Sequence, residues 1–336
     1  MKLRKNVLLS VLIIFSVFFA SEILLESSSM SIEVKATSND HTVSDFELTN
    51  IWDNEPFSLT NFTDVGIVVI IQFFATWCGY CHNQLDALSE IGEWGDDKVA
   101  IVSVSIDSTD GATNPSTGNT KLYDDAVAHD MDWYVALDTA DLWTGKPNPD
   151  FFGELVASRW GIPTMLIVSP TRELVWWQLG YSGSEYNTMV TEIEELWASD
   201  TSAPELSSIQ IDPIELNEFT TSISVTLTAT DTFGIESLLL QLCSSTACYL
   251  SVPMTQGVDG RWGATLTNVS SVLSMDLDEL VLKVIAQDRI GNEETYLIHT
   301  YYGLTSVVTT GWNASIMILL AGISLISLFF IRKRKN

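Results

Sequence analysis

The residues best suited to chemistry are two cysteines separated by two residues, Cys78 and Cys81. They follow an almost unbroken apolar run, residues 65–74, and precede a stretch with apolar side chains at intervals of three, residues 85–91. The first pattern predicts a buried central strand, and the second predicts an amphipathic helix. Unpaired backbone N–H groups at the start of a helix stabilise a thiolate. The spacing therefore predicts a redox pair in which Cys78 is the nucleophile and Cys81 resolves the mixed disulfide.

Two other uses of such a pair are a zinc site and a purely structural disulfide. Zinc needs two further ligands at short spacing, and the other cysteines, Cys243 and Cys248, lie far along the chain. Structural disulfides outside the cell rarely close a two-residue loop between a strand and a helix. Asp231 and Asp288 offer calcium ligands, but aspartates in surface turns are commoner than metal sites. We therefore expect no metal and no cofactor.

The two ends of the chain predict export and a membrane tether. Residues 1–25 place basic side chains before an apolar run, as in a signal peptide or an uncleaved signal anchor. Residues 314–331 carry no charge and are close to the roughly 20 residues that span a bilayer. The basic tail, 332–336, then stays in the cytoplasm. The expected location is the cell membrane, crossed once, or twice if the first segment is uncleaved, with both main domains outside the cytoplasm.

The charge excludes one class of partner. The chain has a formal net charge of −27, and seven of its sixteen basic residues lie in the two ends just described. The part between them is therefore even more acidic than the whole chain. Such a surface repels polyanions, so we expect no nucleic-acid partner.

A change of pattern near residue 200 predicts two domains. Residues 41–199 alternate short β-rich runs with helix-like stretches, which is typical of an α/β sandwich. Residues 200–204 are a small polar linker, and residues 205–302 show only short alternating segments separated by turns. The expected fold is therefore an α/β domain followed by an all-β domain and a C-terminal transmembrane helix.

The segment from Phe73 to Cys81 reads Phe-Phe-Ala-Thr-Trp-Cys-Gly-Tyr-Cys. It resembles the active-site segment of the TlpA/ResA-like membrane-anchored thiol-disulfide oxidoreductases of the thioredoxin superfamily. The run Trp-Gly-Ile-Pro-Thr, residues 160–164, resembles the cis-proline loop of the same family. The resemblance covers roughly residues 41–199 and implies a thioredoxin fold. It also implies a cis bond before Pro163 and a substrate strand that pairs with the backbone of Ile162 beside Cys78.

The same resemblance assigns supporting roles around the cysteines. It places Gly79, Tyr80 and Thr164 in the active-site surroundings, with Trp77 partly over the sulfurs and partly in the core. The sequence departs from the family at two positions. Gln72 stands where soluble thioredoxins have a buried acid, and Gln84 stands where ResA-like proteins have a glutamate. Proton management then depends on water or on His82, although a histidine on an exposed helix surface is the simpler interpretation.

The second domain resembles the immunoglobulin-like or fibronectin-like modules of microbial surface proteins. Alternation at Ile223, Val225 and Leu227 marks the buried face of one strand. Cys243 and Cys248 flank a polar turn and are expected to close a small structural disulfide. The resemblance implies a module that spaces or orients the first domain above the membrane.

The resemblance implies a protein thiol-disulfide oxidoreductase that reduces or isomerises disulfides in exported proteins, with an unidentified electron donor or acceptor in the membrane. Gly79-Tyr80 also occurs in periplasmic disulfide isomerases, so the direction of electron flow stays open. Two alternatives remain. One is a peroxiredoxin-like peroxide reductase, which shares the fold and a similar amino-terminal half. The other is a cell-surface binding protein that uses the thioredoxin fold as a non-catalytic scaffold.

Overall fold

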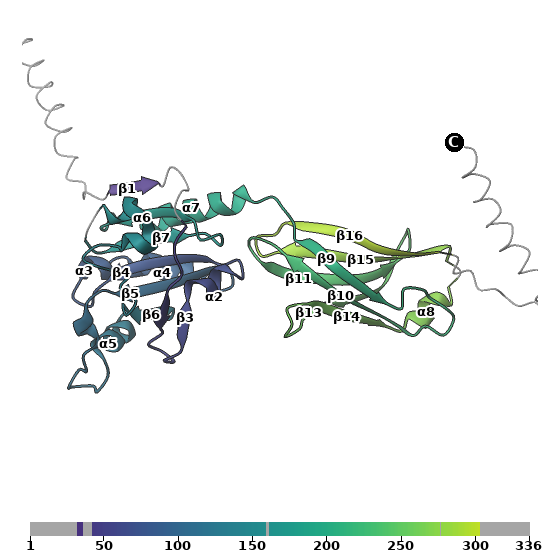
Figure 1. Ribbon diagram of the computed structural model, residues 1–336, viewed down its shortest axis with the longest axis horizontal. Coiled ribbons are helices and arrows are strands. Elements are labelled where there is room, and N and C mark those ends of the chain that lie inside the picture. The colour runs from purple at the N-terminus through teal and green to yellow at the C-terminus, as the bar shows by residue number, and fades with distance from the viewer. Residues whose placement is uncertain (1–31, 36–41, 159–160, 276, 303–336) are drawn as a thin grey trace, which may run out of the picture.

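The computed structural model describes residues 32–35, 42–158, 161–275 and 277–302. The predicted signal segment, the transmembrane helix at 314–331 and the basic tail lie outside these residues. Within the described part of the chain, no helix combines the length and the apolar character needed to cross a membrane. The described residues form an α/β domain followed by an antiparallel β domain (Figure 1).

The first domain is built on a six-stranded sheet with the order β1-β8-β7-β4-β5-β6. Strands β4, β5 and β6 are parallel, whereas β1, β8, β7 and β4 pair in antiparallel fashion. This is a thioredoxin-like α/β sheet. The strand bounds are Ile32–Lys35 for β1, Val68–Phe74 for β4, Val99–Ser105 for β5, Tyr134–Leu137 for β6, Thr164–Val168 for β7 and Leu174–Leu179 for β8.

Helices and a hairpin cover both faces of this sheet. The hairpin consists of β2 (Glu47–Thr49) and β3 (Pro56–Ser58). The helices are α2 (Leu59–Thr63), α3 (Gly79–His82), α4 (Leu85–Gly92), η1 (Ser108–Gly111), α5 (Lys121–Ala128), α6 (Pro149–Ala157) and α7 (Glu185–Ser199). Helices α4, α5 and α7 contribute to one core cluster, and the hairpin, α2 and α6 contribute to the other. Strand β4 lies between the two clusters, and all seven of its residues are buried.

The second domain consists of two four-stranded antiparallel sheets around one apolar core. One sheet has the order β13-β14-β10-β9, and the other has the order β12-β11-β15-β16. The bounds are Glu205–Asp212 for β9, Ser222–Thr230 for β10, Ile235–Cys243 for β11, Cys248–Pro253 for β12, Thr255–Gln256 for β13, Trp262–Thr267 for β14, Glu279–Asp288 for β15 and Glu293–Tyr302 for β16. One short helix, α8 (Val269–Leu273), interrupts the expected all-β pattern.

Loops of the second domain contact the first domain. Phe233 is 3% exposed and belongs to the same core cluster as the two cysteines, and Ile290 packs against that cluster. The guanidinium of Arg289 donates a hydrogen bond to the carbonyl of Val65. The side-chain amide of Asn292 donates to the carbonyl of Asp200, just after α7, at 3.2 Å. The β domain is therefore packed against the α/β domain through apolar and polar contacts.

Three carboxylates gather where the linker meets these loops, namely Asp200, Asp231 and Asp288. Burial, followed by the charges of Asp288 and Asp200, raises the pKa of Asp231 to about 6, although a backbone hydrogen bond from Phe233 opposes the shift. The folded state therefore keeps a proton on Asp231 at pH values where the unfolded chain has released it. The contribution of this group to stability is present below about pH 4 and is lost as the pH rises through about 6.

Replacing Asp231 with asparagine is expected to flatten the pH dependence of stability in this window, because the amide keeps the acceptor oxygen for Phe233 but does not titrate. The measurement is the urea midpoint of the full-length chain in detergent at pH 4.5 and at pH 6.5. The parent should lose more stability between the two values than Asp231→Asn. Asp259→Asn, on an exposed turn of the second domain, is the control and should keep the slope of the parent. An unchanged slope in Asp231→Asn would show that this carboxyl does not titrate as the geometry implies.

Candidate active site

The two cysteines lie directly after the central strand. Strand β4 ends at Phe74, the chain turns, and Cys78 is the N-cap of α3. Cys78 and Cys81 form a disulfide, and the backbone N–H of Cys81 points at the sulfur of Cys78 with a distance of 3.2 Å. Cys81 is fully buried, whereas Cys78 keeps 7% of its surface. Cys78 is therefore the less buried of the two cysteines, and the predicted order of their roles stays a prediction.

The helix that follows Cys78 is shorter than the sequence pattern suggested. Helix α3 has four residues, and α4 begins at Leu85, after Asn83 and Gln84. A single turn has a small dipole, so the main local stabilisation of a Cys78 thiolate comes from nearby N–H groups such as that of Cys81.

Gln72 is the one polar side chain in β4, and it is completely buried. Its amide nitrogen donates to the carbonyl of Cys81 at 3.3 Å and to the side-chain oxygen of Gln84 at 3.2 Å. Its oxygen accepts from the hydroxyl of Ser103 at 3.0 Å, and that hydroxyl accepts from the indole of Trp133 at 2.9 Å. All hydrogen-bonding atoms of the Gln72 amide are satisfied, so a neutral network replaces the buried acid of soluble thioredoxins beneath Cys81.

The same network reaches the loop at Pro163. The amide of Gln84 donates to the carbonyl of Gly180 at 3.1 Å, and the backbone N–H of Gly180 donates to the carbonyl of Pro163 at 2.8 Å. The Ile162–Pro163 peptide bond is cis, as the resemblance implied. Gln84 is fully buried, so neither glutamine is a solvent-exposed proton carrier.

The loop before β7 runs beside the end of β4. Thr164 pairs with Phe73 in the sheet, and Ile162 packs against the core cluster that holds both cysteines. The hydroxyl of Thr164 donates to the carbonyl of Gly161 at 2.8 Å, which holds the loop. Among the residues that the structure describes, the backbone of Ile162 has no hydrogen-bond partner.

Trp77 does not enter the core, contrary to the sequence interpretation. It is 67% exposed, and its indole N–H donates to the carboxylate of Asp107 at 2.7 Å. Tyr80 is 68% exposed on the next turn, and a side chain at Gly79 would meet open space. A hydrogen bond from the backbone of Thr109, followed by the one from Trp77, lowers the pKa of Asp107. Two exposed aromatic side chains therefore flank Cys78.

Asp110 supports the active-site turn, and the sequence pattern gave no sign of it. It lies in a segment rich in small polar residues, which reads as a surface loop, yet it is only 1% exposed. Its carboxylate accepts from the backbone N–H and the hydroxyl of Thr76, at 3.1 and 2.7 Å, and from the hydroxyl of Ser105 at 2.7 Å. Asp110 thereby ties the turn before Cys78 to the end of β5.

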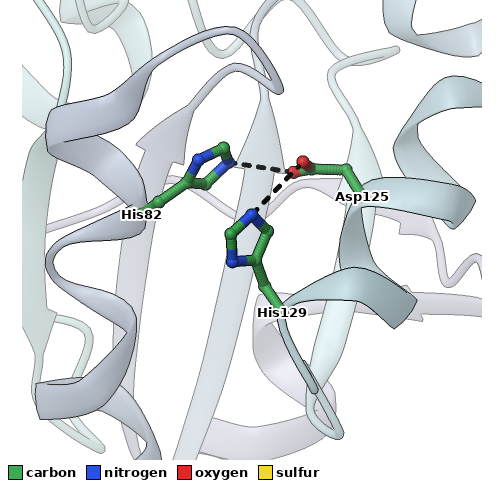
Figure 2. A group of neighbouring side chains, drawn as sticks. All are labelled: His82, Asp125 and His129. Carbon is green, nitrogen blue, oxygen red and sulfur yellow. Dashed lines mark hydrogen bonds and ion pairs between the residues drawn. The ribbon is translucent and has the colours of Figure 1, made fainter.

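His82 is not a simple surface histidine. Its side chain is 19% exposed, its Nε2 lies 3.2 Å from a carboxylate oxygen of Asp125, and its ring stacks on that of His129 with centroids 3.9 Å apart. The Nε2 of His129 lies 3.7 Å from the other oxygen of Asp125. Figure 2 shows both rings directed at this one carboxylate. Burial raises the pKa of Asp125, although the charges of the two histidines oppose the shift.

The other cysteines lie in the second domain and form a separate disulfide. Cys243 and Cys248 are paired across β11 and β12 and are bonded to each other, which fits the predicted hairpin bridge. They are not part of the Cys78 site. A cavity of about 750 Å³ opens at Trp52, Val127 and Trp133, but its lining includes neither Cys78 nor Cys81.

Residues 40–139 match the AhpC/TSA family. The match includes both active-site cysteines and ends before Pro163. No curated protein matches the chain.

Solved structures that resemble the chain cover about half of it. A putative thiol:disulfide interchange protein DsbE from Chlorobium tepidum is 16% identical over 47% of this chain and 96% of its own, with a TM-score of 0.36. StoA from Bacillus subtilis is 19% identical over 44% and 96%, with a TM-score of 0.32. The exposed lipoprotein thioredoxin Etrx1 from Streptococcus pneumoniae is 22% identical over 45% and 99%, with a TM-score of 0.32.

Removing the amide of Gln72 is expected to destabilise the first domain. Gln72→Leu leaves the Cys81 carbonyl, the Ser103 hydroxyl and the Gln84 side chain short of a buried partner. We expect the free energy of unfolding of the oxidised chain to fall by about 1–3 kcal/mol, measured by urea unfolding. The control is Gln256→Leu on an exposed strand, which should stay within about 0.5 kcal/mol of the parent. Equal stability of Gln72→Leu and the parent would mean that the network does not hold this part of the fold.

Proposed function

We propose that the protein is a thiol-disulfide oxidoreductase that reduces or isomerises disulfides in exported proteins. The observation that carries the proposal is the Cys78–Cys81 disulfide just after the end of β4, in which Cys78 keeps 7% of its surface and Cys81 is fully buried. The AhpC/TSA match over residues 40–139, which includes both cysteines, supports the proposal.

The reaction exchanges one disulfide for another. The Cys78 thiolate attacks a substrate disulfide, an S–S bond forms between Cys78 and the substrate, and the second substrate sulfur leaves as a thiolate and takes up a proton. The Cys81 thiol then loses its proton and attacks Cys78, which forms the Cys78–Cys81 disulfide and releases the first substrate sulfur. Two electrons have passed to the substrate. A dithiol donor must return them to Cys78 and Cys81, and we propose that this donor is a membrane protein. In isomerisation the substrate's own thiol resolves the mixed disulfide, and no net electrons move.

An extended polypeptide fits the surroundings of Cys78. The unpaired backbone of Ile162 offers an edge for strand addition, and main-chain hydrogen bonds of this kind bind peptides with little regard to sequence. Exposed Trp77 and Tyr80 add apolar contact area on the other side. These features support a protein substrate over a small molecule held in a cavity.

Peroxide reduction is the second candidate, since peroxide reductases share this fold and amino-terminal half and the AhpC/TSA match covers that half. The disulfide between cysteines two residues apart favours thiol-disulfide exchange, because it pairs the reactive sulfur with a resolving one within a single turn. A non-catalytic scaffold would have no need of such a pair.

Cys78→Ser is expected to remove the ability to reduce insulin disulfides in the presence of dithiothreitol, because serine cannot form the mixed disulfide. Cys81→Ala should instead accumulate mixed disulfides with substrate proteins. The matched control is Cys243→Ser combined with Cys248→Ser, which removes the distant bridge and should leave insulin reduction intact. Measuring peroxide consumption beside insulin reduction distinguishes peroxide reduction from thiol-disulfide exchange.

Full insulin reduction by Cys78→Ser would contradict the assigned role. Faster turnover of peroxide than of insulin would assign the site to peroxide reduction. If the Cys78–Cys81 pair showed no reversible reduction in a glutathione titration, the domain would be a scaffold.

We further propose that the chain is tethered by residues 314–331 with both described domains outside the cytoplasm, and that the β domain, immunoglobulin-like by resemblance, spaces the active site from the membrane. The hydropathy and basic tail of the sequence support this orientation. A chain that stops after residue 313 should be released from carbonate-washed membranes, whereas the full chain should remain bound. Retention of the shortened chain would assign the anchor to residues 1–25.

A further inference from the structure

Beside the cysteines lies a second group of side chains that thiol exchange does not require. It consists of His82 from α3, Asp125 from α5 and His129, the C-cap of α5. Asp125 and His129 are four residues apart, so the helix places them on one face, and the fold brings His82 to the same place from the active-site turn. Figure 2 shows the two rings converging on the carboxylate.

We propose that His82, Asp125 and His129 form a binding site for a divalent transition-metal ion of the zinc and copper class. One ligand atom from each residue lies within 4.8 Å of the other two. Zinc bonds of about 2.0–2.2 Å in tetrahedral geometry place ligand atoms roughly 3.3–3.6 Å apart. The two imidazole nitrogens already lie 3.2 and 3.7 Å from the oxygens of Asp125. Both nitrogen–oxygen distances are therefore close to the spacing of ligand atoms around a zinc ion.

The donor set selects the class of ion. Calcium takes six to eight oxygen ligands and magnesium prefers oxygen in octahedral geometry, whereas this group offers two imidazoles and one carboxylate. Imidazole suits zinc, copper, nickel and iron, and among divalent ions the affinity order favours copper and zinc over iron. Two neutral histidines and one carboxylate carry one negative charge, and the acidic chain around them attracts cations further.

Access and burial also fit a metal site. Asp125 and His82 are 13% and 19% exposed, so they are largely withdrawn from water, while His129 is 36% exposed and leaves an entry path. Three protein ligands leave one tetrahedral position for water or an incoming group.

The test uses the full-length chain in detergent with both disulfides closed, so that thiolates cannot serve as ligands and the outcome does not depend on the proposed exchange reaction. Zinc is titrated against a competing chelator in the presence of excess magnesium, which occupies sites made only of carboxylates. We expect one zinc ion per chain. His82→Gln, His129→Gln and Asp125→Asn should each weaken zinc binding at least about tenfold. His299→Gln, in β16 of the other domain, is the matched control and should bind zinc as the parent does.

Circular dichroism shows whether each variant is folded. A spectroscopic measurement on the parent chain tests the proposal even if a variant fails to fold. Copper(II) added at one equivalent should show nitrogen hyperfine splitting from imidazole in its paramagnetic resonance spectrum, and the same splitting in His299→Gln. Zinc binding of equal strength in the parent and in the folded His82→Gln and His129→Gln variants would overturn the proposal. A copper spectrum with oxygen ligands alone would overturn it as well.

Discussion

The arrangement of the active site depends on a polar side chain in the centre of an apolar strand. Gln72 is buried on β4 among residues that are otherwise apolar, and an unpaired amide there would cost about 1–3 kcal/mol for each group. The chain satisfies it with the carbonyl of Cys81, with Gln84 and with Ser103. Because these partners come from the active-site turn and from β5, satisfying Gln72 also fixes where the second cysteine lies.

That constraint separates the two cysteines into different environments. Cys81 is fully buried and its carbonyl accepts a hydrogen bond from Gln72, while Cys78 keeps 7% of its surface and lies between the exposed residues Trp77 and Tyr80 in the sequence. Asp110 holds the turn between them and the strand by binding Thr76.

Local patterns predicted much of the first domain, because its strands are buried on both faces and its cysteines lie at a strand end. The apolar run before Cys78, the helix after it and the change to β structure after residue 200 are all in the fold. The cis bond at Pro163 followed from resemblance and not from spacing, since Ile-Pro-Thr alone reads as a turn.

What the sequence did not reveal depends on contacts between distant segments. Asp110 lies among small polar residues in the sequence. Nothing in that segment shows that its carboxylate accepts three hydrogen bonds from β5 and the active-site turn. Asp125 and His129 look like ordinary polar positions of a helix until α3 brings His82 to them. Phe233 reads as a turn residue of the β domain, yet it completes the core of the other domain. In each case the environment of the residue depends on segments that are far away in the sequence, so the local spacing of residues does not predict it.

The acidity of the chain sets a final condition on the chemistry. A net charge of −27 opposes a thiolate at Cys78, but charges in water are screened beyond about 8 Å at physiological salt, so the distant ones have little effect. The nearby carboxylates are each held by donors: Asp107 by Trp77, Asp110 by Thr76 and Ser105, and Asp125 by His82. A reactive cysteine can then work in a strongly acidic protein because its immediate hydrogen-bond donors, and not the total charge, decide the stability of the thiolate.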